Sequence, residues 1–214
     1  MLRNTLTITP ADNQPVWRFN LTPEGDGLAA PSVRIAHPLV DEILEAFAPD
    51  IGRDLRGYRN HVFRVLNYYE ALSGQASEVP ASVLIAAAFH DLGIWTDQTF
   101  DYLPPSMHLA TTYLLERGLG HLEAEVHALI AEHHKLSRYA GARHEEAFAD
   151  RVETFRRADH VDVSLGVLRF GLSRSTIVEV KRALPDAGFH RRLAVLSAAH
   201  FLKSPLRPLP MVHW

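Results

Sequence analysis

Thirteen histidines and no cysteine restrict the metal chemistry that this chain of 214 residues can perform. Without cysteine, disulfides, thiolate metal sites and cysteine nucleophiles are excluded. A transition-metal site would have to use imidazole and carboxylate groups, which suit iron, manganese, cobalt, nickel or zinc. The histidine count alone is a weak signal, so the positions of the histidines on the predicted helices must decide which of them bind metal.

Two histidines and two aspartates occupy positions that apolar residues of the predicted helices share. His61 lies one turn before a valine, His90 lies on a helix that is almost wholly apolar, and Asp159 follows Phe155 by one turn. Asp91 ends the apolar helix, where a carboxylate opposes the helix dipole and follows apolar residues. Because buried charges are normally paired or bound to metal, a metal ion would compensate these carboxylates.

The same four residues stand in a pattern that resembles the signature of the HD superfamily. The segments are NHVFRV, AAFHDLG and RADHVD, and the resemblance covers roughly residues 55–165. A His-Asp pair alone is a weak signal, but here it ends an apolar helix, precedes a glycine, and has a histidine upstream and an aspartate downstream. The resemblance implies that the metal ligands are His61, His90, Asp91 and Asp159.

A second metal ion is the next expectation from this resemblance. HD proteins with two ions use two additional histidines, which correspond here to His108 and His133, with Asp91 bridging the ions. His133 shares a helical face with Ile130, so it is predicted to point inward and His134 to the side. The expected cofactor is therefore one or two divalent ions per chain, of iron, manganese, cobalt, nickel or zinc.

The activity implied by the resemblance is hydrolysis of a phosphoester, such as a nucleotide or a small phosphomonoester, by a metal-bound hydroxide. The residues expected to take part in catalysis are His61, His90, Asp91, His134 and Lys135. Of these, His134 or Lys135 would donate a proton to the leaving group. Arg64 and Arg138 are predicted to bind an anionic substrate, and a surface position on a helix is the alternative for Arg64.

Other functions stay open at this stage. HD proteins with two irons include oxygenases that cleave C–C or C–P bonds, and the positions of His108 and His133 suit them equally well. HD proteins resembling cyanamide hydratase use one zinc ion to hydrate a small nitrile-like substrate. Ile94 stands where many HD phosphodiesterases have a lysine, which disfavours cyclic-dinucleotide hydrolysis. A metal-dependent sensor or binding module is the non-enzymatic alternative.

The elements that must position these residues are predicted to be helices from Pro38 onward. The predicted helices span residues 39–47, 53–72, 80–92, 107–118, 121–136, 145–166, 175–184 and 190–202. Ser106 is the expected cap of the fourth helix. Short loops between such helices are typical of an all-α bundle, here an HD domain.

Two regions outside these helices bear on the site. Residues 1–31 alternate apolar and polar positions and are interpreted as an N-terminal extension, with a small β-hairpin as one form, ahead of an HD domain at 32–214 with C-terminal helices. Trp95, Phe100 and Tyr102 would either line a substrate pocket or anchor their loop. Asp162 would either support the ligands from behind or pair locally.

The charge and hydropathy of the chain limit its partners. A formal charge of −3 gives no basic surface for duplex nucleic acid, so a small-molecule substrate, in this reading an anionic one, is expected. No apolar run approaches the roughly 20 residues needed to cross a bilayer, and the first residues do not resemble a secretory signal. We therefore expect a cytoplasmic protein without membrane partners, and the sequence does not determine its oligomeric state.

Overall fold

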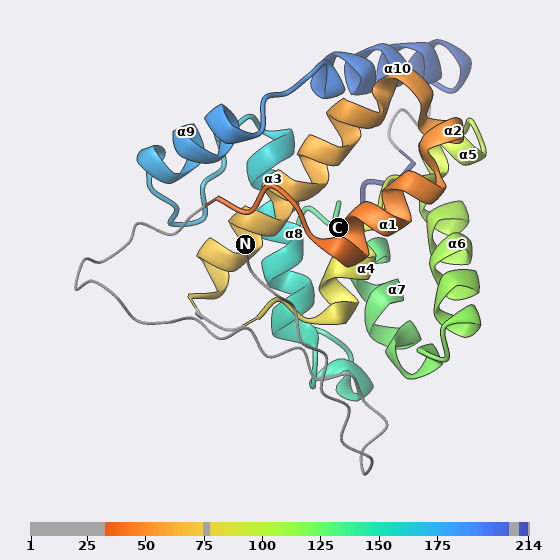
Figure 1. The fold of residues 1–214 in the computed structure, drawn as a ribbon, viewed down its shortest axis with the longest axis vertical. Coiled ribbons are helices and arrows are strands. Elements are labelled where there is room, and N and C mark those ends of the chain that lie inside the picture. The colour runs from red at the N-terminus through yellow and green to blue at the C-terminus, as the bar shows by residue number, and fades with distance from the viewer. Residues whose placement is uncertain (1–32, 75–77, 206–209, 214) are drawn as a thin grey trace, which may run out of the picture. The chain divides into compact units, whose positions relative to one another are not determined.

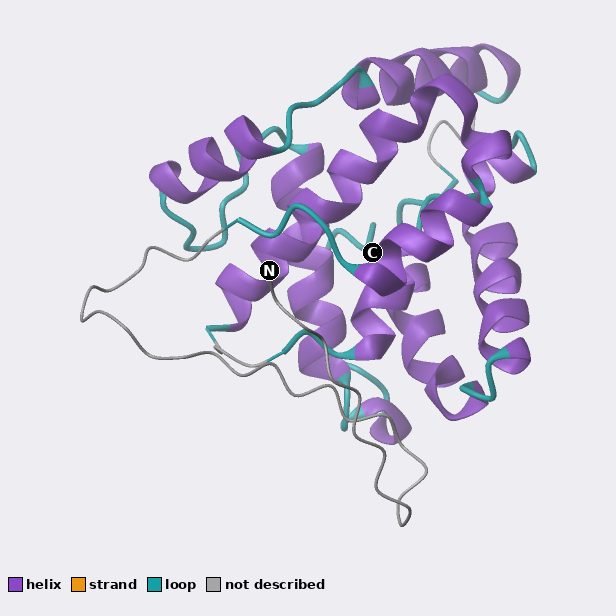
Figure 2. Cartoon of the chain, in the orientation of Figure 1, coloured by secondary structure: helices purple, strands orange, loops and turns teal. Residues whose placement is uncertain are grey.

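Helices form the regular structure of the part of the chain that the computed structural model describes, which is residues 33–74, 78–205 and 210–213. Figure 2 shows these helices joined by short loops, and the predicted all-α class is confirmed. Within the described ranges, β-type pairing is limited to one bridge between Lys135 and His213. The interpretation of residues 1–31 as an extension with a hairpin falls outside the described residues.

The helices are labelled in Figure 1 in chain order. They are α1 (Pro38–Ala46), α2 (Ala48–Ile51), η1 (Gly52–Asp54), α3 (Leu55–Ser73), α4 (Ala81–Phe89), α5 (Gly93–Thr96), α6 (Leu103–Glu116), η2 (Gly120–Leu122), α7 (Glu123–Glu132), η3 (Arg143–Glu145), α8 (Ala149–Val163), α9 (Arg174–Ala183) and α10 (Phe189–Lys203). The η elements are short 3₁₀ turns.

The core lies where α3, α4, α7 and α8 meet. Helix α3 packs along α8, and α4 packs against both α7 and α3, while α10 lies across one end of α3 (Figure 1). Helix α4 is buried on all sides, and Val83, Ile85 and Phe89 have no exposed surface. Full burial of such a side chain contributes about 1.5–3 kcal/mol, which explains an apolar helix without a polar face. The C-terminal end of α4 is thereby fixed at the centre of the domain.

The start of α6 differs from the prediction. Helix α6 begins at Leu103, so Ser106 lies inside the first turns and is not the cap. Its hydroxyl instead accepts a hydrogen bond from the backbone N–H of Gly93 at 3.0 Å. A Cβ on Gly93 would stand 2.6 Å from the carbonyl oxygen of Tyr102, so only glycine permits this close approach. The contact holds α6 against the residues that follow the His-Asp pair.

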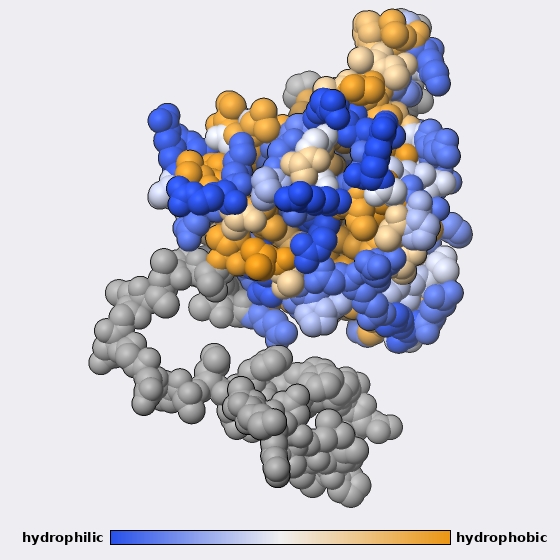
Figure 3. Space-filling model, turned by 45° about the horizontal axis from the view of Figure 1, so that its top comes forward, coloured by the Kyte–Doolittle hydropathy of each residue, from blue (hydrophilic) through white to orange (hydrophobic). Residues whose placement is uncertain are grey.

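The surface mixes polar and apolar side chains, as the face in Figure 3 shows. The exposed apolar side chains include neighbours in sequence, such as Val167 with Leu168 and Phe201 with Leu202. None of the helices in the described ranges is both long enough and apolar enough to span a membrane.

Candidate metal centre

Six buried or nearly buried side chains converge from α3, the end of α4, the end of α7 and α8. They form three overlapping groups in which the potential ligand atoms lie within 4.8 Å of one another. The groups are His61–His90–Asp159, His90–Asp91–His133 and His133–His134–Asp159. We call these six residues the His/Asp cluster. The four residues that the HD-like pattern indicated as ligands therefore lie together, and His133 lies with them.

The packing of the helices explains this convergence. His61 is in the middle of α3 and faces α8, which contains Asp159. The apolar helix α4 ends at Phe89, so the next two residues, His90 and Asp91, reach the same point from a third direction. The apolar faces that build the core thus also aim the polar ligands inward.

Both histidines at the end of α7 reach the cluster. On a continuous helix, adjacent side chains point about 100° apart. Helix α7 ends at Glu132, four residues before the predicted end, and His133 and His134 lie in the turn that follows. Their ring centroids are 4.0 Å apart. His134 is the more exposed of the two, in keeping with its predicted lateral position, and its Nδ1 atom still lies 3.7 Å from Asp159 Oδ2.

The donor atoms have the spacing of ligands around a common ion. The Nε2 atom of His61 lies 3.5 Å from Asp159 Oδ1 and 3.6 Å from Asp91 Oδ2. The Nε2 atom of His90 lies 3.5 Å from the same Asp91 oxygen and 2.9 Å from His61 Nε2. Donors placed about 2.0–2.2 Å from one ion stand roughly 3–4 Å from each other. Divalent metal binding is consistent with these distances.

Unpaired buried atoms support the same conclusion. In the described part of the chain, both carboxylate oxygens of Asp159, Oδ1 of Asp91 and Nε2 of His133 are buried without a hydrogen-bond partner. The distance from His133 Nε2 to Asp91 Oδ1 is 3.5 Å, too long for a good hydrogen bond. Burying such groups unpaired is costly, and a cation that accepts their lone pairs removes that cost. Two carboxylates with neutral imidazoles also balance the charge of one divalent ion.

The members of the cluster differ in the direction of their pKa shifts. Burial lowers the pKa of His90 to about 3, so this imidazole is neutral. Burial acts to raise the pKa of Asp91, but His90 and His133 outweigh it and hold this carboxyl well below its usual range. Burial raises the pKa of Asp159 to about 7. For His133, burial acts to lower the pKa, but the neighbouring Asp91 and Asp159 raise it overall.

Metal affinity is therefore expected to fall as the pH falls from about 8 to about 6. Asp159, with a pKa of about 7, gains a proton across this range, and a metal ion must displace that proton to bind. The raised pKa of His133 acts in the same direction. We expect Co²⁺ affinity, measured by calorimetric titration, to drop at least about tenfold, with more protons released at the lower pH. Equal affinity at both pH values would contradict this assignment of protons.

A buried ion pair orients His61. The Nδ1 atom of His61 lies 2.7 Å from Asp162 Oδ2. Arg64 donates to both oxygens of this carboxylate, from Nε at 2.6 Å and from Nη2 at 2.8 Å. Burial acts to raise the pKa of Asp162, but the hydrogen bonds from His61 and Arg64 lower it well below its usual range. The ionised carboxylate keeps the proton on Nδ1 and turns the Nε2 lone pair toward the cluster.

Arg64 is consequently not available for substrate. Its remaining Nη1 group donates to the carbonyl oxygens of Leu184 and Pro185 at 3.2 and 3.3 Å, and only 1% of the residue is exposed. The predictions of a substrate clamp and of a surface arginine are both wrong for this residue. Asp162, in contrast, supports His61 from behind, which was one of its two expected roles.

His108 lies outside the cluster. Helix α6 turns Ser106 and Ala110 inward, and His108, two positions from each, is exposed on the opposite side. It belongs to none of the three groups. The expectation that His108 completes a second metal site is therefore wrong, and His134 occupies the sixth position of the cluster.

Two further predicted residues also lie outside the cluster. The Nζ atom of Lys135 stands 3.7 Å from a carboxylate oxygen of Glu132. Arg138 is exposed beyond the end of α7. Neither residue is one of the six members of the cluster. Proton donation by Lys135 and binding of an anionic substrate by Arg138 stay predictions.

Two aromatic residues complete the surroundings of the cluster. The hydroxyl of Tyr102 lies 2.6 Å from Nε2 of His134. Phe189, the first residue of α10, stacks on His61 with the ring centroids 4.1 Å apart. The sequence suggests that Tyr102 either lines a pocket or anchors its loop. It does not indicate Phe189, because no local pattern predicts a contact between Phe189 and His61, which are far apart in sequence.

Comparison with known proteins adds no relative: no family model, curated protein or solved structure matches the chain.

Proposed function

We propose that this protein is a metal-dependent hydrolase of the HD superfamily and that the His/Asp cluster holds its catalytic ion. The observation that supports this most strongly is the set of buried, unpaired donor atoms on Asp91, His133 and Asp159, which face one another across the cluster. A bound divalent ion would lower the pKa of a coordinated water and neutralise charge that develops on the substrate. Iron, manganese, cobalt, nickel and zinc all suit these ligands.

The side chains of the cluster have distinct roles in this proposal. Asp162 holds His61 in the tautomer that presents Nε2 to the ion. His134 is the most exposed member of the cluster, with 14% of its side chain accessible, so the substrate approaches from its side. Burial lowers the pKa of His134 well below its usual value, and the hydroxyl of Tyr102 fixes its Nε2 atom. Since this low pKa leaves the His134 imidazole without a proton to donate, the hydroxyl of Tyr102 is the group beside it that carries a proton for a leaving group.

The proposed substrate is a small phosphoester, as the resemblance to HD proteins implies. The other cluster residues are nearly inaccessible, so only a small reacting group reaches them. A phosphoryl group satisfies this limit, and its oxygens would gain from a divalent ion in a site of low dielectric constant.

Hydration of a small nitrile-like substrate is the second candidate. Arg64, which the sequence predicts as a clamp for an anionic substrate, is fully engaged by Asp162 and two carbonyl groups. A neutral nitrile needs no cation to bind it. The loss of Arg64 as a substrate clamp therefore favours nitrile hydration more than the sequence alone does. The oxygenase alternative has less support, because His108 is not in the cluster.

Elemental analysis combined with a substrate screen tests these proposals. We expect one or two divalent ions per chain and metal-dependent phosphate release from small phosphomonoesters. Formation of an amide from a small nitrile or of urea from cyanamide, without phosphate release, would replace the first candidate with the second. Two irons together with oxygen consumption would favour the oxygenase. A protein that binds no metal at neutral pH would contradict all three.

A further inference from the structure

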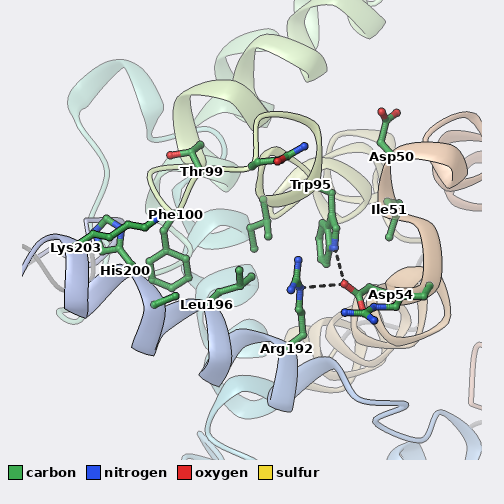
Figure 4. A pocket seen from close by; sticks show the side chains of 14 residues that line it. Asp50, Ile51, Asp54, Trp95, Thr99, Phe100, Arg192, Leu196, His200 and Lys203 are labelled. Carbon is green, nitrogen blue, oxygen red and sulfur yellow. Dashed lines mark hydrogen bonds and ion pairs between the residues drawn. The ribbon is translucent and has the colours of Figure 1, made fainter.

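A cavity of about 440 Å³ lies between α10, the α2–η1 segment, and α5 with the residues that follow it (Figure 4). Its volume is within the usual range of sites for small organic ligands. None of the six members of the His/Asp cluster lines it. The cavity is therefore a separate site, and the proposed hydrolase activity does not explain it.

Aromatic and apolar side chains form the walls of this cavity. Trp95 of α5 and Phe100 of the following segment face the cavity from one side. His200 and Leu196 of α10 face it from the other (Figure 4). The rings of Phe100 and His200 are 5.3 Å apart between centroids and tilted by 36°. Such walls favour a flat ring, which can stack on them.

The charged groups around the cavity favour an anion. Arg53, Arg192 and Lys203 oppose Asp50 and Asp54, and Figure 4 shows Lys203 and the Arg192–Asp54 pair at opposite ends. Asp54 is already engaged, because it accepts a hydrogen bond from Trp95 Nε1 at 3.1 Å and pairs with Arg192 Nε at 3.0 Å.

A second cavity adds a further positively charged side chain at one end of the first. It shares Arg53, Asp54 and Arg192 with the first cavity and adds Arg191. Across both cavities the cationic side chains outnumber the carboxylates, so the local potential attracts a negatively charged group.

We propose that this cavity binds an organic anion that contains a flat aromatic ring system. The ring lies between Trp95 on one side and the Phe100–His200 pair on the other, and the anionic group is held by the exposed cations Arg53 and Arg191 at the end that the two cavities share. Trp95 also packs on Tyr58, with centroids 4.7 Å apart, and Tyr58 neighbours both His61 and His90. The ligand is thus separated from the metal ligands by two aromatic side chains.

Calorimetric titration of the full, metal-loaded chain with naphthalene-2-sulfonate tests this proposal. This probe is an aromatic anion without a hydrolysable ester. We expect one saturable site with a Kd below about 1 mM. Methanesulfonate lacks the ring and 2-naphthol lacks the full charge, and each should bind at least about tenfold more weakly. Failure of naphthalene-2-sulfonate to bind, or equal binding of either comparison compound, would overturn the proposal.

A pair of double variants locates the site. Arg53→Ala with Arg191→Ala removes two exposed cations from the end that the two cavities share and should weaken naphthalene-2-sulfonate binding about tenfold. Arg169→Ala with Arg174→Ala removes the same charge from exposed positions that do not line the cavity and should change the Kd less than about twofold. Equal weakening in both double variants would show a general charge effect and overturn the assignment of the site.

Discussion

Replacing Asp91 with alanine is expected to remove the bound metal and the catalytic turnover together. One oxygen of Asp91 faces Nε2 of His61 and His90 at 3.6 and 3.5 Å, and the other faces Nε2 of His133 at 3.5 Å. The substitution therefore removes a carboxylate that faces three of the imidazoles of the cluster. Since the loss of a supporting residue alone typically lowers metal affinity 10–100-fold, we expect more than about a 100-fold loss here.

Metal content after dialysis and the rate of product formation measure this effect. Asp97→Ala is a matched control, because Asp97 is exposed in the loop that follows α5 and should leave both quantities unchanged. His108→Ala is the second control, and it should also retain full metal content because His108 is exposed on α6. An Asp91→Ala protein that is folded by circular dichroism and keeps both metal and turnover would eliminate the proposed centre.

The convergence of the four candidate ligands could be predicted because each lies in or directly after a helix with a clear apolar face. His61 and Asp159 lie within helices whose neighbouring apolar residues fix the inward direction. His90 and Asp91 follow a helix that is buried on all sides, so any residue at its end reaches the core. The inward direction of these four side chains could therefore be predicted from local periodicity alone.

The errors arose at helix ends, where periodicity gives little information. A helix that starts at Leu103 and is held by the Gly93–Ser106 hydrogen bond turns His108 outward. A helix that ends at Glu132 lets two consecutive histidines reach the same cluster. Helix boundaries depend on tertiary contacts that a local pattern does not contain.

Long-range contacts were the second source of error. Arg64 is enclosed by Asp162 of α8 and by the carbonyl groups of Leu184 and Pro185, which follow α9. Phe189 reaches His61 from α10. No spacing within α3 distinguishes an arginine that binds substrate from one that orients a ligand, because the difference depends on residues about 100 positions away.

Replacing Arg64 with alanine is expected to destabilise the protein and to weaken metal binding. The substitution leaves Asp162 as a buried carboxylate without its cation, and breaking a buried pair in this way costs about 3–5 kcal/mol. Asp162 also orients His61, so the metal affinity should fall about 10–100-fold. Urea denaturation with and without Co²⁺ measures both effects on the same variant.

Arg59→Ala provides the matched control for Arg64 on the same helix. Arg59 pairs with Asp41, but about a third of each side chain is exposed, so its loss should cost less than about 1 kcal/mol and leave Co²⁺ affinity unchanged. Because metal binds the folded state alone in this scheme, the stabilisation by Co²⁺ should be smaller in Arg64→Ala than in Arg59→Ala at the same Co²⁺ concentration. Equal stabilisation in the two variants would mean that the Arg64–Asp162 pair supports the fold without orienting His61.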